Sequence, residues 1–107
     1  MEIEILHIGD CPNWRETGVL VTQTLRELGA EETPVTFTLL TTPEEAARVP
    51  FAGSPTVLID GVDAFPSGPA TTALACRIYS VDGHFAGMPS QVALRRVLET
   101  ALATSTA

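Results

Sequence analysis

Hydrophobic residues along the first part of the chain follow the two periods of regular secondary structure. Residues 2–8 form a short apolar run that is typical of a buried strand. Residues 35–39 alternate between apolar residues and threonine, which predicts a second strand. Between them, apolar or small residues recur at helical steps of four and three, at Trp14, Gly18, Val21, Leu25 and Leu28. Gly29 is a natural stop for this helix.

The second part of the chain contains shorter elements. Thr42, Pro43 and Glu45 make a capping-box pattern, which predicts a short helix through Arg48. A loop over 50–54 then leads to a third apolar strand. A final helix over 90–103 is predicted by its apolar face, Leu94, Val97, Leu98, Ala101 and Leu102.

The third strand, 55–59, is followed by the dipeptide Asp60-Gly61, a two-residue hairpin signal that predicts a returning strand over 62–65. Segment 66–88 is interpreted as an irregular insertion, in which Asp82-Gly83 is a turn. The element order is therefore β-α-β-short α-β-β-α. A right-handed crossover makes the first two strands parallel, so the prediction is a single α/β domain over 1–107, with a four-stranded mixed sheet flanked by helices.

Composition and charge narrow the functional classes. Hydrophobic residues make up 45% of the 107 residues, and the formal net charge is −7, with arginine as the only strong cation. This charge lacks the basic footprint of a nucleic-acid-binding protein. No run of apolar residues is long enough to span a membrane, and we expect no leader before the first predicted strand. We expect a soluble cytoplasmic protein with no cofactor.

The candidate chemistry lies in two cysteines, Cys11 and Cys76. Together with His7 and His84 they do not make a zinc-binding pattern, and neither histidine has a visible catalytic partner. Cys11 directly precedes the first predicted helix, whose amide groups and dipole stabilise a thiolate and lower the thiol pKa. The neighbouring carboxylate of Asp10 acts in the opposite direction.

Three features in order resemble the thioredoxin and glutaredoxin superfamily, and the resemblance runs from Ile3 to about Leu102. These are Cys11-Pro12 at the strand-to-helix junction, Ser54-Pro55-Thr56 at the start of the third strand, and the hairpin over 55–68. The resemblance implies a thioredoxin-like fold, a nucleophilic thiol at Cys11 and a cis Pro55 that faces it. Pro12, Trp14 and Pro55 would shape this site. Trp14, however, stands where the dithiol members carry their second cysteine, which excludes a local two-cysteine exchange.

The chain also resembles small actinobacterial thioredoxin-family proteins and alkylmercury-lyase-like proteins. The chain has no lysine and is rich in alanine, threonine and arginine, a composition typical of proteins encoded by GC-rich genomes. The lyase resemblance places Cys11 and Cys76 at the two thiol positions that bind mercury. The position of the acid that cleaves the carbon–mercury bond is taken by Trp14, so catalysis of that cleavage is disfavoured.

Three functions follow as alternatives. The leading hypothesis is a thiol redox protein with Cys11 as nucleophile and Cys76 as a remote resolving thiol, acting on a thiol or disulfide substrate through a mixed disulfide. The second is a soft-metal or organomercurial site made by the same two thiols. The third is a binding module without chemistry, in which Cys76 is an ordinary core residue. The distance between the cysteines tests the first two together, because a disulfide requires Cα atoms within about 7 Å. A short distance keeps both of them, and a long one removes both the remote resolving thiol and the two-thiol metal site.

Overall fold

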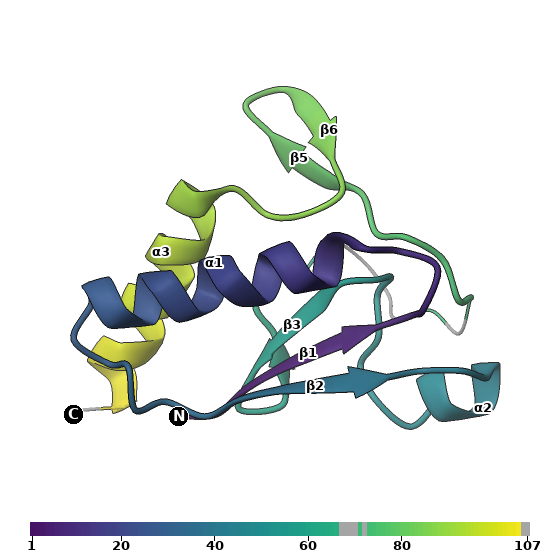
Figure 1. Cartoon of the computed structure of the whole chain (residues 1–107), viewed down its shortest axis with the longest axis horizontal. Helices are drawn as coiled ribbons and strands as arrows, with labels where there is room; N and C mark the ends of the chain where they lie inside the picture. The colour runs from purple at the N-terminus through teal and green to yellow at the C-terminus, as the bar shows by residue number, and fades with distance from the viewer. Residues whose placement is uncertain (67–70, 72, 106–107) are drawn as a thin grey trace.

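The chain forms a four-stranded mixed sheet with helices on both faces. A computed structural model describes residues 1–66, 71 and 73–105 (Figure 1). The elements follow in the order β1 (Ile3–His7), α1 (Asn13–Glu27), β2 (Val35–Leu39), α2 (Pro43–Ala46), β3 (Thr56–Ile59), β4 (Val62–Asp63), β5 (Tyr79–Val81), β6 (His84–Ala86) and α3 (Gln91–Ser105).

The strands of the main sheet are arranged in the order β2-β1-β3-β4. β1 pairs with β2 in parallel, with Ile3 opposite Val35, as the predicted crossover through α1 requires. β1 pairs with β3 in the antiparallel direction, and β3 pairs with β4 in the same way. The sequence prediction of an α/β domain with a mixed four-stranded sheet is therefore confirmed.

One face of the sheet is covered by the two long helices, α1 and α3. The buried side chains of this layer come from β1, β3 and both helices, namely Ile3, Ile5, Val21, Leu25, Val57, Leu94 and Leu98. Side chains alternate between the faces of a strand, so Ile3 and Ile5 point to the helices. The apolar stripes of α1 and α3 that the sequence predicts both contribute to this core.

The other face is covered by α2 and the loops around it. Its buried cluster contains Leu6, Ile8, Cys11, Leu40, Ala46, Phe51 and Leu58. Leu6 and Leu58 have the opposite parity to the residues beneath α1, which is why they reach this second layer. Cys11 is a member of the cluster, so the start of α1 is anchored in the core.

The turns and caps follow the residue types at their positions. Both two-residue turns, the predicted hairpin at Asp60-Gly61 and the predicted turn at Asp82-Gly83, have positive φ angles between 50° and 82° at both residues, as tight hairpin turns require. The capping box at Thr42 and Glu45 is present. The regular part of α2 ends at Ala46, two residues before the predicted end, and only a turn continues to Arg48.

Two regions of the chain differ from the prediction. β4 ends at Asp63 instead of residue 65, because the Asp63 carboxylate accepts a hydrogen bond from the Phe65 N–H and turns the chain away. Within 66–88, which the sequence treats as irregular, the described residues 79–86 form a second sheet, the hairpin β5–β6. Residues 67–70 and 72 of that segment lie outside the described part. Among the described helices, none has the length and apolarity needed to cross a membrane.

The contribution of the α3 stripe can be measured by truncating one of its core residues. Leu98 is fully buried, and Leu98→Ala is expected to lower the free energy of unfolding by about 2–5 kcal/mol, since it removes apolar contacts and leaves a cavity. Urea denaturation followed by circular dichroism measures the change. Val92→Ala on the exposed side of α3 is the control, with an expected change within about 0.5 kcal/mol. Equal effects of both variants would contradict this packing.

Candidate functional site

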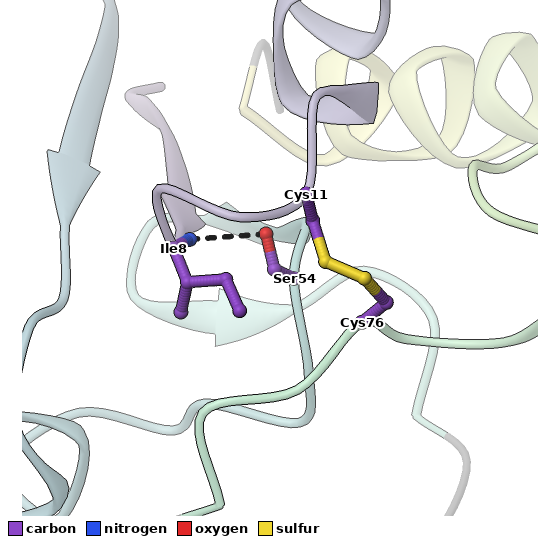
Figure 2. Close-up of a disulfide and its surroundings, with 4 residues drawn as sticks. All are labelled: Ile8, Cys11, Ser54 and Cys76. Carbon is purple, nitrogen blue, oxygen red and sulfur yellow. Dashed lines mark hydrogen bonds between the residues drawn. A yellow bond between two sulfur atoms is a disulfide. The ribbon is translucent and has the colours of Figure 1, made fainter.

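The two cysteines form a disulfide that joins the start of α1 to the segment before β5 (Figure 2). From the sequence alone, Cys76 was either a core residue or a partner of Cys11. Their Cα atoms are 5.9 Å apart although 65 positions separate them in sequence. This distance is within the range a disulfide requires. The structure therefore makes Cys76 the partner of Cys11.

Cys11 lies between the end of β1 and the first turn of α1. It is 1% exposed, whereas the preceding Asp10 is exposed. Pro12 is the N-cap residue, one position before the first helical residue, and no side chain caps the helix there. The first amide groups of a helix have no partner within the helix, and they favour a negative charge beside them. A thiolate at Cys11 would be such a charge.

Cys76 is held beside the sheet by backbone hydrogen bonds on both sides of it. The Ser54 N–H donates to the Ala75 carbonyl at 2.9 Å, and the Arg77 N–H donates to the Ser54 carbonyl at 2.8 Å. These bonds make a parallel bridge between Ser54 and Cys76. The Ser54 hydroxyl accepts a third bond, at 3.1 Å, from the N–H of Ile8 (Figure 2). Ser54 thus connects the Cys76 segment to the loop that leads into Cys11.

Pro55 follows directly, and the Ser54–Pro55 peptide is cis, as the sequence resemblance implied. The Pro55 carbonyl accepts a hydrogen bond from the buried hydroxyl of Tyr79, in β5. Burial raises the pKa of Tyr79 above its ordinary value, with smaller opposing and reinforcing effects of the Arg77 and Asp63 charges. The hydroxyl therefore keeps its proton and remains a donor. This bond attaches the hairpin β5–β6 to the start of β3.

The residue after Cys76 makes an ion pair that sequence reasoning missed. Arg77 is 4% exposed, and its guanidinium donates to both carboxylate oxygens of Asp63, at 3.0 and 3.2 Å. It also donates to the carbonyl of Phe65. A single charge in the apolar run 73–79 is a signal that a partner is needed. The identity of the partner depends on the path of the chain, which the sequence does not give.

Gly53 permits the close approach between the two segments. Its φ is +107°, a conformation that L side chains rarely adopt. A Cβ atom placed on Gly53 would lie 2.8 Å from both Cα and Cβ of Arg77, which is closer than real contacts. The backbone bonds of Ser54 to the Cys76 segment therefore depend on the absence of a side chain at the preceding position.

Trp14, which the sequence resemblance compares with the second cysteine of dithiol members, packs on β1. Its ring stacks on His7 with centroids 4.0 Å apart, and its edge meets Phe37 at 5.5 Å. The guanidinium carbon of Arg15 lies 5.1 Å from the Trp14 ring centroid. Trp14 is partly buried against the core beneath α1. Its observed contacts are thus those of a shielding aromatic residue at the start of the helix.

The two histidines differ in their surroundings. His84 is exposed on β6 rather than in a loop. His7 is buried in β1, and its Nδ1 atom has no hydrogen-bond partner among the described residues. Burial lowers the pKa of His7, a hydrogen bond with the Ile8 backbone raises it, and the charge of Arg15 lowers it, with a net decrease. His7 is therefore a neutral core ring at neutral pH.

The chemistry available to this site is that of two thiols in disulfide reach. Both cysteines of the chain are in the disulfide, so reduction would release two adjacent thiols. Such a pair can cycle between disulfide and dithiol, or hold a soft metal ion. In the part of the chain that the structure describes, no group of three or more His, Cys, Asp and Glu side chains could hold a metal ion.

The Asp63–Arg77 ion pair is expected to anchor the Cys76 segment. Asp63→Asn keeps the shape of the side chain but removes the negative charge that pairs with the buried guanidinium. Removing one partner of a buried pair costs about 3–5 kcal/mol, and the free energy of unfolding of the oxidised protein should fall toward this range. Urea denaturation measures it. Asp82→Asn, at an exposed turn, is the control. A decrease no larger than that of the control would show that the pair contributes nothing net.

The lowered pKa of His7 predicts a pH dependence of stability. The unfolded chain binds a proton at His7 with the ordinary pKa of about 6.5, so it binds that proton more tightly than the folded chain does. The contribution is therefore complete above about pH 6.5 and is lost as the pH falls toward the folded-state pKa. His7→Phe keeps an aromatic ring on Trp14 and removes the titration.

Denaturation at about pH 7 and about pH 5 measures this effect. The loss of stability between the two pH values should be smaller in His7→Phe than in the parent chain, whereas His84→Gln should lose as much as the parent. If His7→Phe and the parent lose the same free energy, His7 does not titrate as its burial requires.

Comparison with known proteins gives no family for this arrangement. No protein-family model matches the chain, and no curated protein and no solved structure is significantly similar to it.

Proposed function

We propose that this chain is a thioredoxin-like thiol–disulfide redox protein in which Cys11 and Cys76 form the redox pair. The observation that carries the proposal is the disulfide between a thiol at the start of a 15-residue helix and a distant, exposed cysteine. Such a pair holds two electrons in its dithiol form and releases them when it is oxidised to the disulfide. We place this activity in the cytoplasm, where a reversible disulfide is used for redox chemistry rather than for permanent stabilisation.

The proposed thioredoxin likeness is supported by how the elements position the pair. The sheet order β2-β1-β3-β4 places β1 and β3 side by side in the centre. The chain leaving β1 carries Cys11. The cis peptide before β3 is held next to this chain by the hydrogen bond from the Ile8 N–H to the Ser54 hydroxyl. This placement agrees with the resemblance of Cys11-Pro12 and Ser54-Pro55-Thr56 to that superfamily.

The proposed reaction proceeds through a mixed disulfide. A thiolate of a reduced partner attacks one sulfur of the Cys11–Cys76 bond, forms a new S–S bond to it and displaces the other cysteine as a thiolate. A second partner thiol then attacks the partner sulfur of the mixed disulfide and releases the remaining cysteine. The chain gains two electrons and two protons, and the partner becomes a disulfide. The reverse sequence reduces a disulfide substrate.

The start of α1 gives the two sulfurs different leaving abilities. The unpartnered amide groups before the first turn stabilise a thiolate at Cys11, and Pro12 supplies no competing side-chain oxygen. Cys76 itself lies outside the described helices and is held in an isolated bridge. A lower thiol pKa makes a better leaving group in thiol exchange. Cys11 is therefore the thiolate that separates from the disulfide most readily.

The anchors of the Cys76 segment favour a reversible cycle. The bonds of Ser54 to Ala75 and Arg77, and the ion pair of Arg77 with Asp63, do not involve either sulfur. They would hold Cys76 close to Cys11 after the disulfide is reduced. The high local concentration of the second thiol then allows the disulfide to form again without a search.

The same geometry supports a second candidate, a soft-metal site made by the two thiolates. Two thiolates can bind a soft ion such as mercury. In the described part of the chain no third His, Cys, Asp or Glu joins them as a ligand. This candidate predicts that the reduced protein binds one mercuric ion and that each Cys→Ser variant loses this binding.

The redox proposal is tested by equilibrating the protein with glutathione buffers of graded ratio. Alkylation of free thiols followed by mass spectrometry should show one cooperative two-electron transition from dithiol to disulfide. In the reduced Cys76→Ser variant, thiolate absorbance should show that Cys11 ionises below about pH 8.5, the value of a free thiol.

A matched control for the ionisation is Cys11→Ser, in which Cys76 should ionise near the free-thiol value. If the pair stays oxidised at every glutathione ratio, the disulfide is structural and the redox proposal fails. If Cys11 ionises above about pH 8.5, the helix does not activate it.

A further inference from the structure

The two cysteines of the disulfide differ in their exposure to solvent. Cys11 is 1% exposed and belongs to the core cluster on the face of the sheet opposite α1 and α3, whereas Cys76 is exposed. An attacking thiolate must approach a disulfide sulfur along the line of the S–S bond, with the other sulfur as leaving group. The burial of Cys11 closes approach to its own sulfur. Attack is therefore directed to the sulfur of Cys76.

This direction places the covalent intermediate on Cys76. The partner thiolate bonds to the Cys76 sulfur, the Cys11–Cys76 bond breaks, and Cys11 leaves with the electron pair as a thiolate at the start of α1. In the opposite direction, Cys76 attacks a substrate disulfide and Cys11 resolves the mixed disulfide. The sequence analysis predicts Cys11 as the nucleophile and Cys76 as the resolving thiol. The exposures of the two residues favour the reverse assignment.

Two large apolar side chains are exposed on the segment and hairpin that follow Cys76. Along the extended segment that begins at Cys76, Arg77 and Tyr79 are buried, whereas Ile78 between them is 69% exposed. Side chains alternate, so Ile78 lies on the same side of the segment as Cys76. Phe85, opposite Ser80 in the hairpin, lies on this side as well and is 84% exposed. We call Ile78 and Phe85 together the hairpin face.

We propose that the hairpin face docks the redox partner, and that the partner is a protein whose reactive cysteine is flanked by apolar side chains. This proposal rests on the proposed redox function. When the thiolate of a partner cysteine reaches the Cys76 sulfur, the residues that flank this cysteine come against Ile78, two positions after Cys76. Burying such side chains against Ile78 and Phe85 removes apolar surface from water and stabilises the encounter.

The position of the hairpin agrees with this partner. Figure 1 shows β5–β6 projecting from the sheet and the long helices, where a partner has room to approach. The one cation of the segment, Arg77, points inward to Asp63. Asp82 and His84 are exposed near the tip of the same hairpin, but the two members of the hairpin face are apolar and therefore match an apolar segment.

The test compares two thiol peptides as reductants of the oxidised protein. In one peptide leucine and phenylalanine flank the cysteine, and in the other serines replace them; dithiothreitol serves as a small reductant. Loss of the disulfide is followed by quenching and mass spectrometry. The apolar peptide should react about tenfold faster than the serine peptide with the parent chain.

The double variant Ile78→Ser/Phe85→Ser should lose this preference and keep its rate with dithiothreitol. Its control is Val62→Ser/Val92→Ser, which removes two apolar residues, each 67% exposed, from other surfaces. The control variant should keep the preference. Circular dichroism checks that both variants fold. An unchanged preference in the first variant, or no preference in the parent chain, overturns the docking proposal and leaves the redox function intact.

The attacked sulfur is tested separately with an activated mixed disulfide of the apolar peptide. Cys11→Ser, which retains the exposed Cys76, should form the peptide adduct faster than Cys76→Ser, which retains the buried Cys11. A faster reaction of Cys76→Ser would overturn the assignment of Cys76. If neither the parent chain nor the variants exchange with any thiol or disulfide, the redox function itself fails.

Discussion

The close backbone approach between Ser54 and Cys76 is the constraint on which the site depends. Both backbone groups of Ser54 are bonded to the residues that flank Cys76, and its hydroxyl receives the Ile8 N–H. One residue thus fixes the distance between the chain leaving β1 and a segment far along the sequence. The approach requires a residue without a side chain at position 53, where a Cβ would collide with Arg77. The disulfide follows from this contact.

Most of the sheet and its long helices could be predicted from local patterns. β1, α1 and α3 have strong periodicity and clear boundaries such as Gly29, and the two Asp-Gly turns require positive φ angles that those residues adopt readily. β4 was predicted too long because its end is set by a side-chain bond from Asp63, which leaves no periodic signal. The thioredoxin-like family assignment itself stays a prediction.

The candidate site could be predicted only in part, for a similar reason. The location of Cys11 before a helix and the cis peptide at Pro55 come from short motifs. The reach of Cys76 depends on Arg77, whose partner Asp63 is brought near by the turn at Asp60-Gly61 and by the return of the chain. Contacts of this kind combine several distant segments, and a single sequence contains no local pattern that specifies them.

In the proposed redox cycle, burial and helix position divide the roles between the two cysteines. Cys11 is 1% exposed and lies beside the unpartnered amides of α1, which suits a sulfur that must leave and wait as a thiolate. Cys76 is exposed and lies beside apolar side chains, which suits a sulfur that must meet a partner. With Trp14 in the position of a neighbouring thiol, these two roles are separated in sequence, and the anchored Cys76 segment brings them together in space.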